Sequence, residues 1–160
     1  METTRIESRA QEPVAKLLCR ELYVPHVYLE VCWPPQGGIR VDVLAIDRAG
    51  IGDAHIVQIR ESADSALNCV PDLMKAPSHF RWIAFNAETV TAEIKARLES
   101  KAELDPPAGA GRVGAIAIER ASEDNLIAKI VVYAERFHGL KYSQIGEYVK
   151  GLEPDMYIRE

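Results

Sequence analysis

The sequence lacks the features of membrane, secreted and disulfide-stabilised proteins. It contains no run of about 18 apolar residues, the length of a membrane-spanning helix, and no charged-then-apolar leader typical of secretion. The cysteines are odd in number and lack CxxC spacing: Cys19, Cys32 and Cys69. Reduced, buried thiols are therefore favoured over disulfides or a zinc site. These absences predict a cytoplasmic protein with no membrane partner.

The common short motifs of enzymes are also missing. There is no G-x-S-x-G nucleophile motif, no P-loop and no G-x-G-x-x-G dinucleotide motif. The glycine-rich segment 109–114 precedes a predicted strand, so it lacks the helix N-terminus that a phosphate cradle needs. The histidines show neither HxxxH nor HxH spacing: His26, His55, His79 and His138. We expect them in the core or on the surface rather than as zinc ligands.

Composition and charge indicate one acidic globular domain. The 160 residues are 48% hydrophobic and 27% charged, so a single domain over residues 1–160 is expected. Because the formal net charge is −5, a nucleic-acid site would have to be a local basic patch. Candidates for such a patch lie on the first predicted helix and around the hairpin after it: Arg5, Arg9, Lys16, Arg20, Arg40, Arg48 and Arg60. A phosphate-binding stripe and an ordinary solvated helix face both explain the four on the helix.

Hydrophobic periodicity predicts alternating helices and strands. The predicted helices cover residues 4–23, 62–75, 89–101, 123–137 and 143–149, and the predicted strands cover residues 27–33, 40–47, 55–61, 80–85 and 113–119. Pro13 also allows the first helix to begin near Glu12, where proline suits the first turn. A helix, a three-strand meander and then alternating elements predict an α/β fold with a central mixed sheet flanked by helices.

The segment 38–61 carries the main candidate for chemistry. Two apolar runs flank a turn that contains Gly50 and Gly52, so the segment is predicted to form a β-hairpin. Strand alternation places Asp42 on one face of the first run, and Gln58 and Arg60 on one face of the second. A carboxylate inside an apolar strand is costly to bury unless a counter-charge or a cation accompanies it.

The predicted helix 123–137 is apolar on more than one side. Its apolar residues include Leu126, Ile127, Ile130, Val131 and Tyr133. Such a helix is either sandwiched within the monomer or buried between two copies of the chain. A homodimer through the C-terminal helices, including the tail helix 143–149, is therefore one expected assembly.

The order of these elements and the residues of the hairpin resemble the PD-(D/E)XK nuclease-like superfamily. That resemblance implies an αβββαβ core, here at about residues 4–86, with a C-terminal βα extension and a tail helix at about residues 87–160. It also implies a site that uses Asp42 on the second strand and Gln58 and Arg60 on the third. Glu12 is the candidate acid on the first helix. In an active member, Glu12, Asp42 and Gln58 would bind Mg²⁺ or Mn²⁺.

Two residues depart from the family pattern. Gln58 replaces an acid, so it brings an amide oxygen but no charge to a cation. Arg60 replaces a lysine, and arginine keeps its proton, so it supplies electrostatic stabilisation without acid–base chemistry. We expect a degenerate, catalytically weak or inactive nuclease-like protein that binds nucleic acid or a protein partner. The alternative is an active metal-dependent endonuclease that hydrolyses phosphodiesters with Asp42 and Glu12 as metal ligands.

Overall fold

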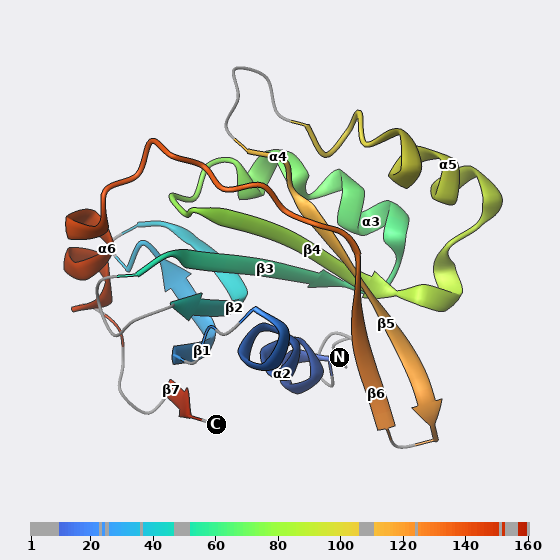
Figure 1. Cartoon of the computed structure of the whole chain (residues 1–160), viewed down its shortest axis with the longest axis horizontal. Coiled ribbons are helices and arrows are strands. Elements are labelled where there is room, and N and C mark those ends of the chain that lie inside the picture. The colour runs from blue at the N-terminus through green and yellow to red at the C-terminus, as the bar shows by residue number, and fades with distance from the viewer. Residues whose placement is uncertain are drawn as a thin grey trace.

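The computed structural model describes residues 10–22, 24, 26–35, 37–46, 52–105, 111–123, 125–150, 152 and 157–159. These residues form one seven-stranded mixed sheet in the order β6-β5-β4-β3-β2-β1-β7 (Figure 1). The strands are β1 (His26–Trp33), β2 (Ile39–Ile46), β3 (Ala54–Arg60), β4 (Phe80–Asn86), β5 (Gly114–Ser122), β6 (Asn125–Val132) and β7 (Tyr157–Arg159). The helices are α2 (Gln11–Glu21), α3 (Ala63–Asn68), α4 (Val70–Leu73), the 3₁₀ turn η1 (Ala87–Thr89), α5 (Ala92–Ser100) and α6 (Tyr142–Val149).

The sheet combines an antiparallel meander with a parallel centre. Strands β1, β2 and β3 pair antiparallel, β3 pairs parallel with β4, and β4 pairs parallel with β5. The edge strand β6 then turns back antiparallel to β5, and the short β7 pairs with β1. The predicted α/β class, with a central mixed sheet flanked by helices, is confirmed.

Most local predictions are confirmed, and proline explains the adjusted ones. The first helix among the described residues, α2, begins at Gln11, which agrees with the later of the two expected starts and puts Pro13 in its first turn. Residues 4–9 of the longer prediction lie outside the described residues. The predicted helix 62–75 is two short helices. Ser62 Oγ accepts the Ser65 N–H at 3.1 Å to cap α3, and Pro71 stands in the first turn of α4. Arg5, Arg9, Arg48 and Gly50 lie outside the described residues.

The predicted helix over residues 123–137 is wrong, because residues 125–132 form the strand β6 and residues 133–137 have no regular secondary structure. Alternate side chains of β6 face inward and outward: Leu126 is 8% exposed, whereas Ile127 is 37% and Val131 is 51% exposed. Apolar residues on both sides fit a strand as well as a buried helix, and the β-branched run that contains Ile130 and Val131 favours the strand. The C-terminal extension is therefore a β-hairpin followed by α6, which confirms the predicted tail helix. Of the two helices expected to form a dimer, only this tail helix is present among the described residues.

Two apolar cores hold the helices against the sheet. On one face, Val14, Leu17 and Leu18 of α2 pack against strand residues that include Val43 and Val57. The other face is covered by α3, α4, α5 and α6, which contribute buried residues to a single cluster around β2, β3 and β4. Figure 1 shows α2 on one side of the sheet and α3, α4 and α5 on the other.

Gly114, the first residue of β5, lies at a tightly packed position of the core on the α2 side of the sheet. A Cβ at Gly114 would clash with the edge of the Trp82 ring, at Cε3 and Cζ3, and would lie 2.7 Å from the Ala134 nitrogen. We predict that Gly114→Ala lowers the free energy of unfolding by about 2 kcal/mol, since overpacking a rigid core costs roughly 1–3 kcal/mol. Urea unfolding measures the change, and Ala121→Ser at an exposed site of the same strand is the control. An unfolding curve unchanged by Gly114→Ala would contradict this packing.

Candidate functional site

The predicted residue Asp42 lies where β2 and β3 separate. Their pairing runs from Ile46 and Ala54 to Val43 and Val57 and then stops. Beyond that point side chains complete the hydrogen bonding that the strand ladder would otherwise supply. The Ile59 N–H donates to Asp42 Oδ2 at 2.7 Å.

A change in strand phase accompanies this separation. Leu29 of β1 packs in the α2-side core, but Val31 packs in the opposite core. Between them, Glu30 has a φ of +52°, which is unusual for a residue other than glycine. In β2, Val43 faces α2 whereas Val41 faces the other core. Both strands therefore switch faces near Asp42, and regular pairing with β3 ends there.

Gln58 and Arg60 also have structural partners at this junction. Gln58 Nε2 donates to the Arg40 carbonyl at 2.7 Å, and Gln58 is only 6% exposed. Arg60 Nη1 lies 3.5 Å from Asp42 Oδ2 and donates to the Ile59 carbonyl at 2.9 Å. Asp42 is 9% exposed, so a charge-assisted contact accompanies a carboxylate that would otherwise be costly to bury. The structure thus brings these three predicted residues together.

Glu12 does not join them. It lies in the first turn of α2, is largely exposed, and forms a surface pair with Lys16 at 3.3 Å. Within the described ranges, no three or more histidine, cysteine, aspartate and glutamate side chains gather as metal ligands. Asp42 lies beside a guanidinium, Gln58 brings no charge, and Glu12 faces solvent away from both. This arrangement does not supply the set of charged oxygen ligands typical of a divalent-cation site.

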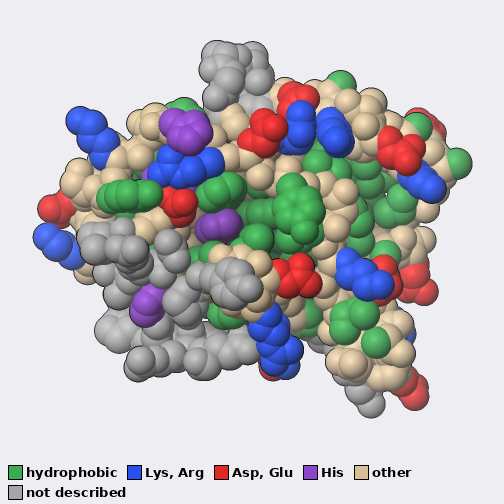
Figure 2. All heavy atoms as spheres, in the orientation of Figure 1, with side chains coloured by type: hydrophobic (Ala, Val, Ile, Leu, Met, Phe, Trp, Pro, Cys, Tyr) green, Lys and Arg blue, Asp and Glu red, His purple; other side chains and the backbone are tan. Residues whose placement is uncertain are grey.

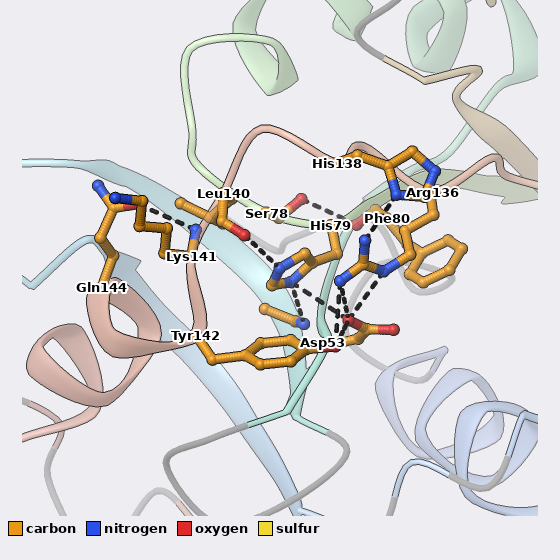
Figure 3. Close-up of polar contacts among 11 residues, drawn as sticks. Asp53, Ser78, His79, Phe80, Arg136, His138, Leu140, Lys141, Tyr142 and Gln144 are labelled. Atoms are coloured by element: carbon orange, nitrogen blue, oxygen red, sulfur yellow. Dashed lines mark hydrogen bonds and ion pairs between the residues drawn. The ribbon is translucent and has the colours of Figure 1, made fainter.

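A second polar cluster, which the sequence analysis did not identify, lies at the opposite end of β3 (Figure 3). Its centre is Asp53, immediately before the strand. Asp53 Oδ1 accepts hydrogen bonds from Arg136 Nε at 3.0 Å, from Arg136 Nη2 at 2.8 Å and from the Tyr142 hydroxyl at 3.0 Å. Burial opposes ionisation of Asp53, but the hydrogen bonds from Arg136 and Tyr142 outweigh it and lower the pKa of the carboxyl group.

His79 supports the same cluster from within the protein. Its Nδ1 accepts the Ala54 N–H at 3.0 Å, so the ring proton is on Nε2, which lies 3.0 Å from the Leu140 carbonyl and donates to it. The imidazole is fully buried, and this burial lowers the pKa of His79. His79 therefore joins β3 and β4 to the segment that precedes α6, as a neutral group.

Beside this cluster, a cavity of about 290 Å³ opens on the α2 side of the sheet. Two polar residues, Asp53 and His55, line it together with apolar and aromatic ones: Leu22, Val24, Phe80, Trp82, Tyr133 and Ala134. In Figure 2 hydrophobic side chains gather at the centre of the visible face, with a histidine among them. This composition is typical of a small-ligand pocket.

His55 is held in one protonation state and orientation. Its Nδ1 accepts the Trp82 indole N–H at 3.1 Å, and its ring stacks on Phe80 at a centroid distance of 4.4 Å and an angle of 11°. Burial lowers the pKa of His55 to about 3. The imidazole is therefore neutral near pH 7, with its proton on Nε2.

Sequence patterns contained only part of this site. Asp53 and His55 are two positions apart, which puts both on one face at the start of a strand. Arg136 and Tyr142 lie 83 and 89 residues from Asp53 in the sequence. The wrong prediction of a helix over residues 123–137 also put Arg136 in a helix. Arg136 and Tyr142 are themselves six residues apart in a segment without a recognisable motif, so no local pattern pointed to them.

The buried neutral histidines predict acid sensitivity. The unfolded chain takes up protons near pH 6.5, whereas folded His55 does so only at about pH 3 and folded His79 below its ordinary value. Stability present at pH 7 is therefore lost as the pH falls below about 6.5, by up to about 1.4 kcal/mol per pH unit for each histidine. Asp53, whose pKa is lowered from 3.8, adds a further loss only at more acidic pH.

The free energy of unfolding, measured by urea unfolding at intervals of about 0.5 pH units between about pH 7.5 and 4.5, gives this slope. The variant His55→Phe is expected to have a shallower slope than the wild type, whatever its absolute stability. Ala121→Ser, at an exposed position of β5 and without a titrating group, is the control and should keep the wild-type slope. Parallel curves for His55→Phe and the wild type would contradict a buried neutral His55.

Comparisons with known proteins identify a similar fold. No family model matches the sequence, and no curated protein matches it. A solved structure, the SPO1766 protein of unknown function from Silicibacter pomeroyi, matches with a TM-score of 0.55 and 17% sequence identity. The match covers 94% of this chain and 85% of that chain. Among the helices that the structure describes, none has the length and apolar character needed to cross a membrane. At this identity the similarity to the Silicibacter protein shows a common fold.

Proposed function

We propose that this protein is a catalytically inactive relative of the PD-(D/E)XK nucleases that works by binding a macromolecular partner. The observation that carries the proposal is the use of Asp42 within the sheet. Its carboxylate accepts the Ile59 N–H at 2.7 Å and faces the Arg60 guanidinium at 3.5 Å. A carboxylate bound in this way contributes to folding, and a cation at Oδ2 would have to displace both the amide and the guanidinium.

Phosphodiester hydrolysis by this type of site needs a cation that activates water and a group that manages protons. Arg60 stays protonated, so it cannot act as a base. The strand β3 contains no aspartate or glutamate, so it supplies no carboxylate to complete a ligand set with Asp42. Its Gln58 donates an amide N–H to the Arg40 carbonyl. The residues around Asp42 therefore support a protein that keeps the nuclease-like fold but does not hydrolyse phosphodiesters.

The order of the elements supports the proposed relationship. The run from α2 through β1, β2, β3 and the α3–α4 pair to β4 is the helix, three strands, helix and strand that the resemblance implies. Asp42 is on the second strand of this run, and Gln58 and Arg60 are on the third. The positions of Asp42, Gln58 and Arg60 on these strands therefore support the proposed relationship.

The charges favour a protein partner over nucleic acid. Several basic side chains that were candidates for phosphate binding pair with acids: Lys16 with Glu12, Arg60 with Asp42, and Arg40 with Glu30. Phosphate binding would have to break these pairs in a chain whose net charge is −5. A nucleic-acid partner is therefore the less supported choice.

The edge strand β6 is the surface best suited to a protein partner. It presents Ile127 and Val131, 37% and 51% exposed, and Tyr133 follows at 64%. An edge strand also presents unpaired backbone groups along one side. We propose that a second copy of this chain pairs with β6 through a two-fold axis, which would replace the predicted dimer of helices with a dimer of strands.

The proposed loss of catalysis predicts the behaviour of Asp42 variants. Asp42→Ala should lower the free energy of unfolding by about 2 kcal/mol, because it removes a buried hydrogen bond to a charged group. Titration of the wild type with Mg²⁺ or Mn²⁺ in a calorimeter should give no saturable heat, and plasmid DNA should stay intact. Asp72→Ala, at an exposed aspartate, is the matched control and should leave stability nearly unchanged. Saturable metal binding and cleavage that both disappear in Asp42→Ala would instead establish the active endonuclease.

The proposed assembly predicts a concentration-dependent dimer. Light scattering coupled to size-exclusion chromatography should give the mass of two chains for the wild type. Val131→Lys should shift the protein to a monomer, because burying an unpaired charge in the interface is costly. Ala121→Lys, at an exposed position of the neighbouring strand β5, should remain dimeric. A wild-type monomer at every soluble concentration would refute the dimer, and a salt-sensitive complex with DNA or RNA would favour the nucleic-acid partner.

A further inference from the structure

The cavity beside Asp53 results from how α2 crosses the sheet. The helix contacts both β2 and β6, and an α-helix is about 10 Å wide with its side chains. Strands β3 and β4 have seven residues each, which is about 23 Å at about 3.3 Å per residue. A helix of that width therefore leaves part of each strand uncovered. The cavity lies at the start of β3 and β4, next to Leu22 and Val24, which follow α2.

The two polar residues of the cavity have complementary hydrogen-bonding roles. All the described hydrogen bonds to Asp53 reach Oδ1, and Figure 3 shows the second carboxylate oxygen pointing away from Arg136 and Tyr142. Oδ2 is therefore an available acceptor. His55 uses Nδ1 to accept from Trp82, so its Nε2–H is a donor, and no described residue accepts from it. Asp53 and His55 are alternate residues at the start of one strand, which places them about 6.6 Å apart on the same face.

The local charge selects against ions. The carboxylate of Asp53 is paired with Arg136 at 2.8 Å, and both His55 and His79 are uncharged near pH 7. A cationic ligand would have to compete with Arg136, and an anionic ligand would meet the carboxylate. The site therefore suits a neutral molecule that supplies one donor and one acceptor.

Aromatic rings determine the shape of that molecule. His55 lies nearly parallel to both Phe80 and Trp82, at interplanar angles of 11° and 14°, and Tyr133 adds a largely exposed ring to the lining. Such walls favour a flat ring that can stack against them. A volume of about 290 Å³ is at the small end for ligand pockets, so one or two fused rings fill it.

From this geometry we propose that the cavity binds a neutral, planar nitrogen heterocycle of nucleobase size, which donates an N–H to Asp53 Oδ2 and accepts the Nε2–H of His55. This site is separate from the Asp42 junction and borders β6 only through Tyr133 and Ala134, which follow that strand. Its recognition groups, Asp53 and His55, lie on β3 or directly before it, so the site goes beyond the proposed partner-binding function and does not depend on it. Recognition by Asp53 and His55, rather than apolar burial alone, is what distinguishes this site from a simple hydrophobic hollow.

The two tryptophans provide an internal test in solution. The indole N–H of Trp82 bonds to His55 in the cavity wall, whereas that of Trp33 bonds to the Pro77 carbonyl in the opposite core. In a ¹H–¹⁵N correlation spectrum, titration with 9-methyladenine should shift the Trp82 indole signal in a saturable way and leave that of Trp33 in place. 9-Methylpurine, which lacks only the amino group, should bind about tenfold more weakly because it cannot supply the donor to Asp53.

Two variants separate recognition from packing. Asp53→Asn should reduce the affinity for 9-methyladenine and remove its advantage over 9-methylpurine. Tyr133→Ala should weaken both ligands about equally, and it changes an exposed residue, so the fold is not at risk. The Trp33 signal reports whether each variant remains folded. The proposal is overturned if 9-methyladenine leaves the wild-type Trp82 signal unmoved up to its solubility limit, or if the two ligands bind the wild type equally well.

Discussion

The hydrogen bond from the Ile59 N–H to Asp42 is the constraint on which the central sheet depends. Strands β1 and β2 both reverse the faces they present near this point, with Glu30 in a left-handed conformation. Regular pairing between β2 and β3 cannot continue through such a reversal. Asp42 and Gln58 supply the missing hydrogen bonds from their side chains, and Arg60 offsets the charge that this arrangement buries. The groups that gave the sequence a nuclease-like appearance therefore hold two strands together.

The other end of β3 is held by contacts between residues distant in the sequence. Asp53 binds Arg136 and Tyr142, and His79 joins Ala54 to Leu140. These bonds attach the segment between β6 and α6 to the beginning of the parallel strands. Asp53 also lines the cavity on the α2 side of the sheet, so a residue that fixes the C-terminal segment is shared with that cavity.

Local sequence patterns were sufficient for most of the fold and for the junction at Asp42. The hairpin over residues 38–61 and the closeness of Asp42 to Arg60 were predicted, although strict alternation in β2 breaks at Asp42, where Val41 joins the same core as Leu44. Pro13 correctly allowed a helix start near Glu12. Residues 123–137 were misassigned because apolar side chains on both sides suit a buried helix and an edge hairpin alike, and only pairing with β5 decides between them. The Asp53 cluster could not be predicted, since its partners come together through tertiary contacts. Glu12 was expected near Asp42, but the face of α2 that packs on the sheet is set by Val14, Leu17 and Leu18.

The most direct test of the structural role of Asp42 is the hydrogen-exchange rate of the Ile59 amide, measured by NMR with and without millimolar Mg²⁺. If the carboxylate is committed to this amide, the proton should exchange slowly and at the same rate in both conditions. If Mg²⁺ accelerates exchange at Ile59 while other amides of β3 are unaffected, the carboxylate has left the sheet to bind the cation. That result would contradict a purely structural Asp42 and restore the metal-dependent site.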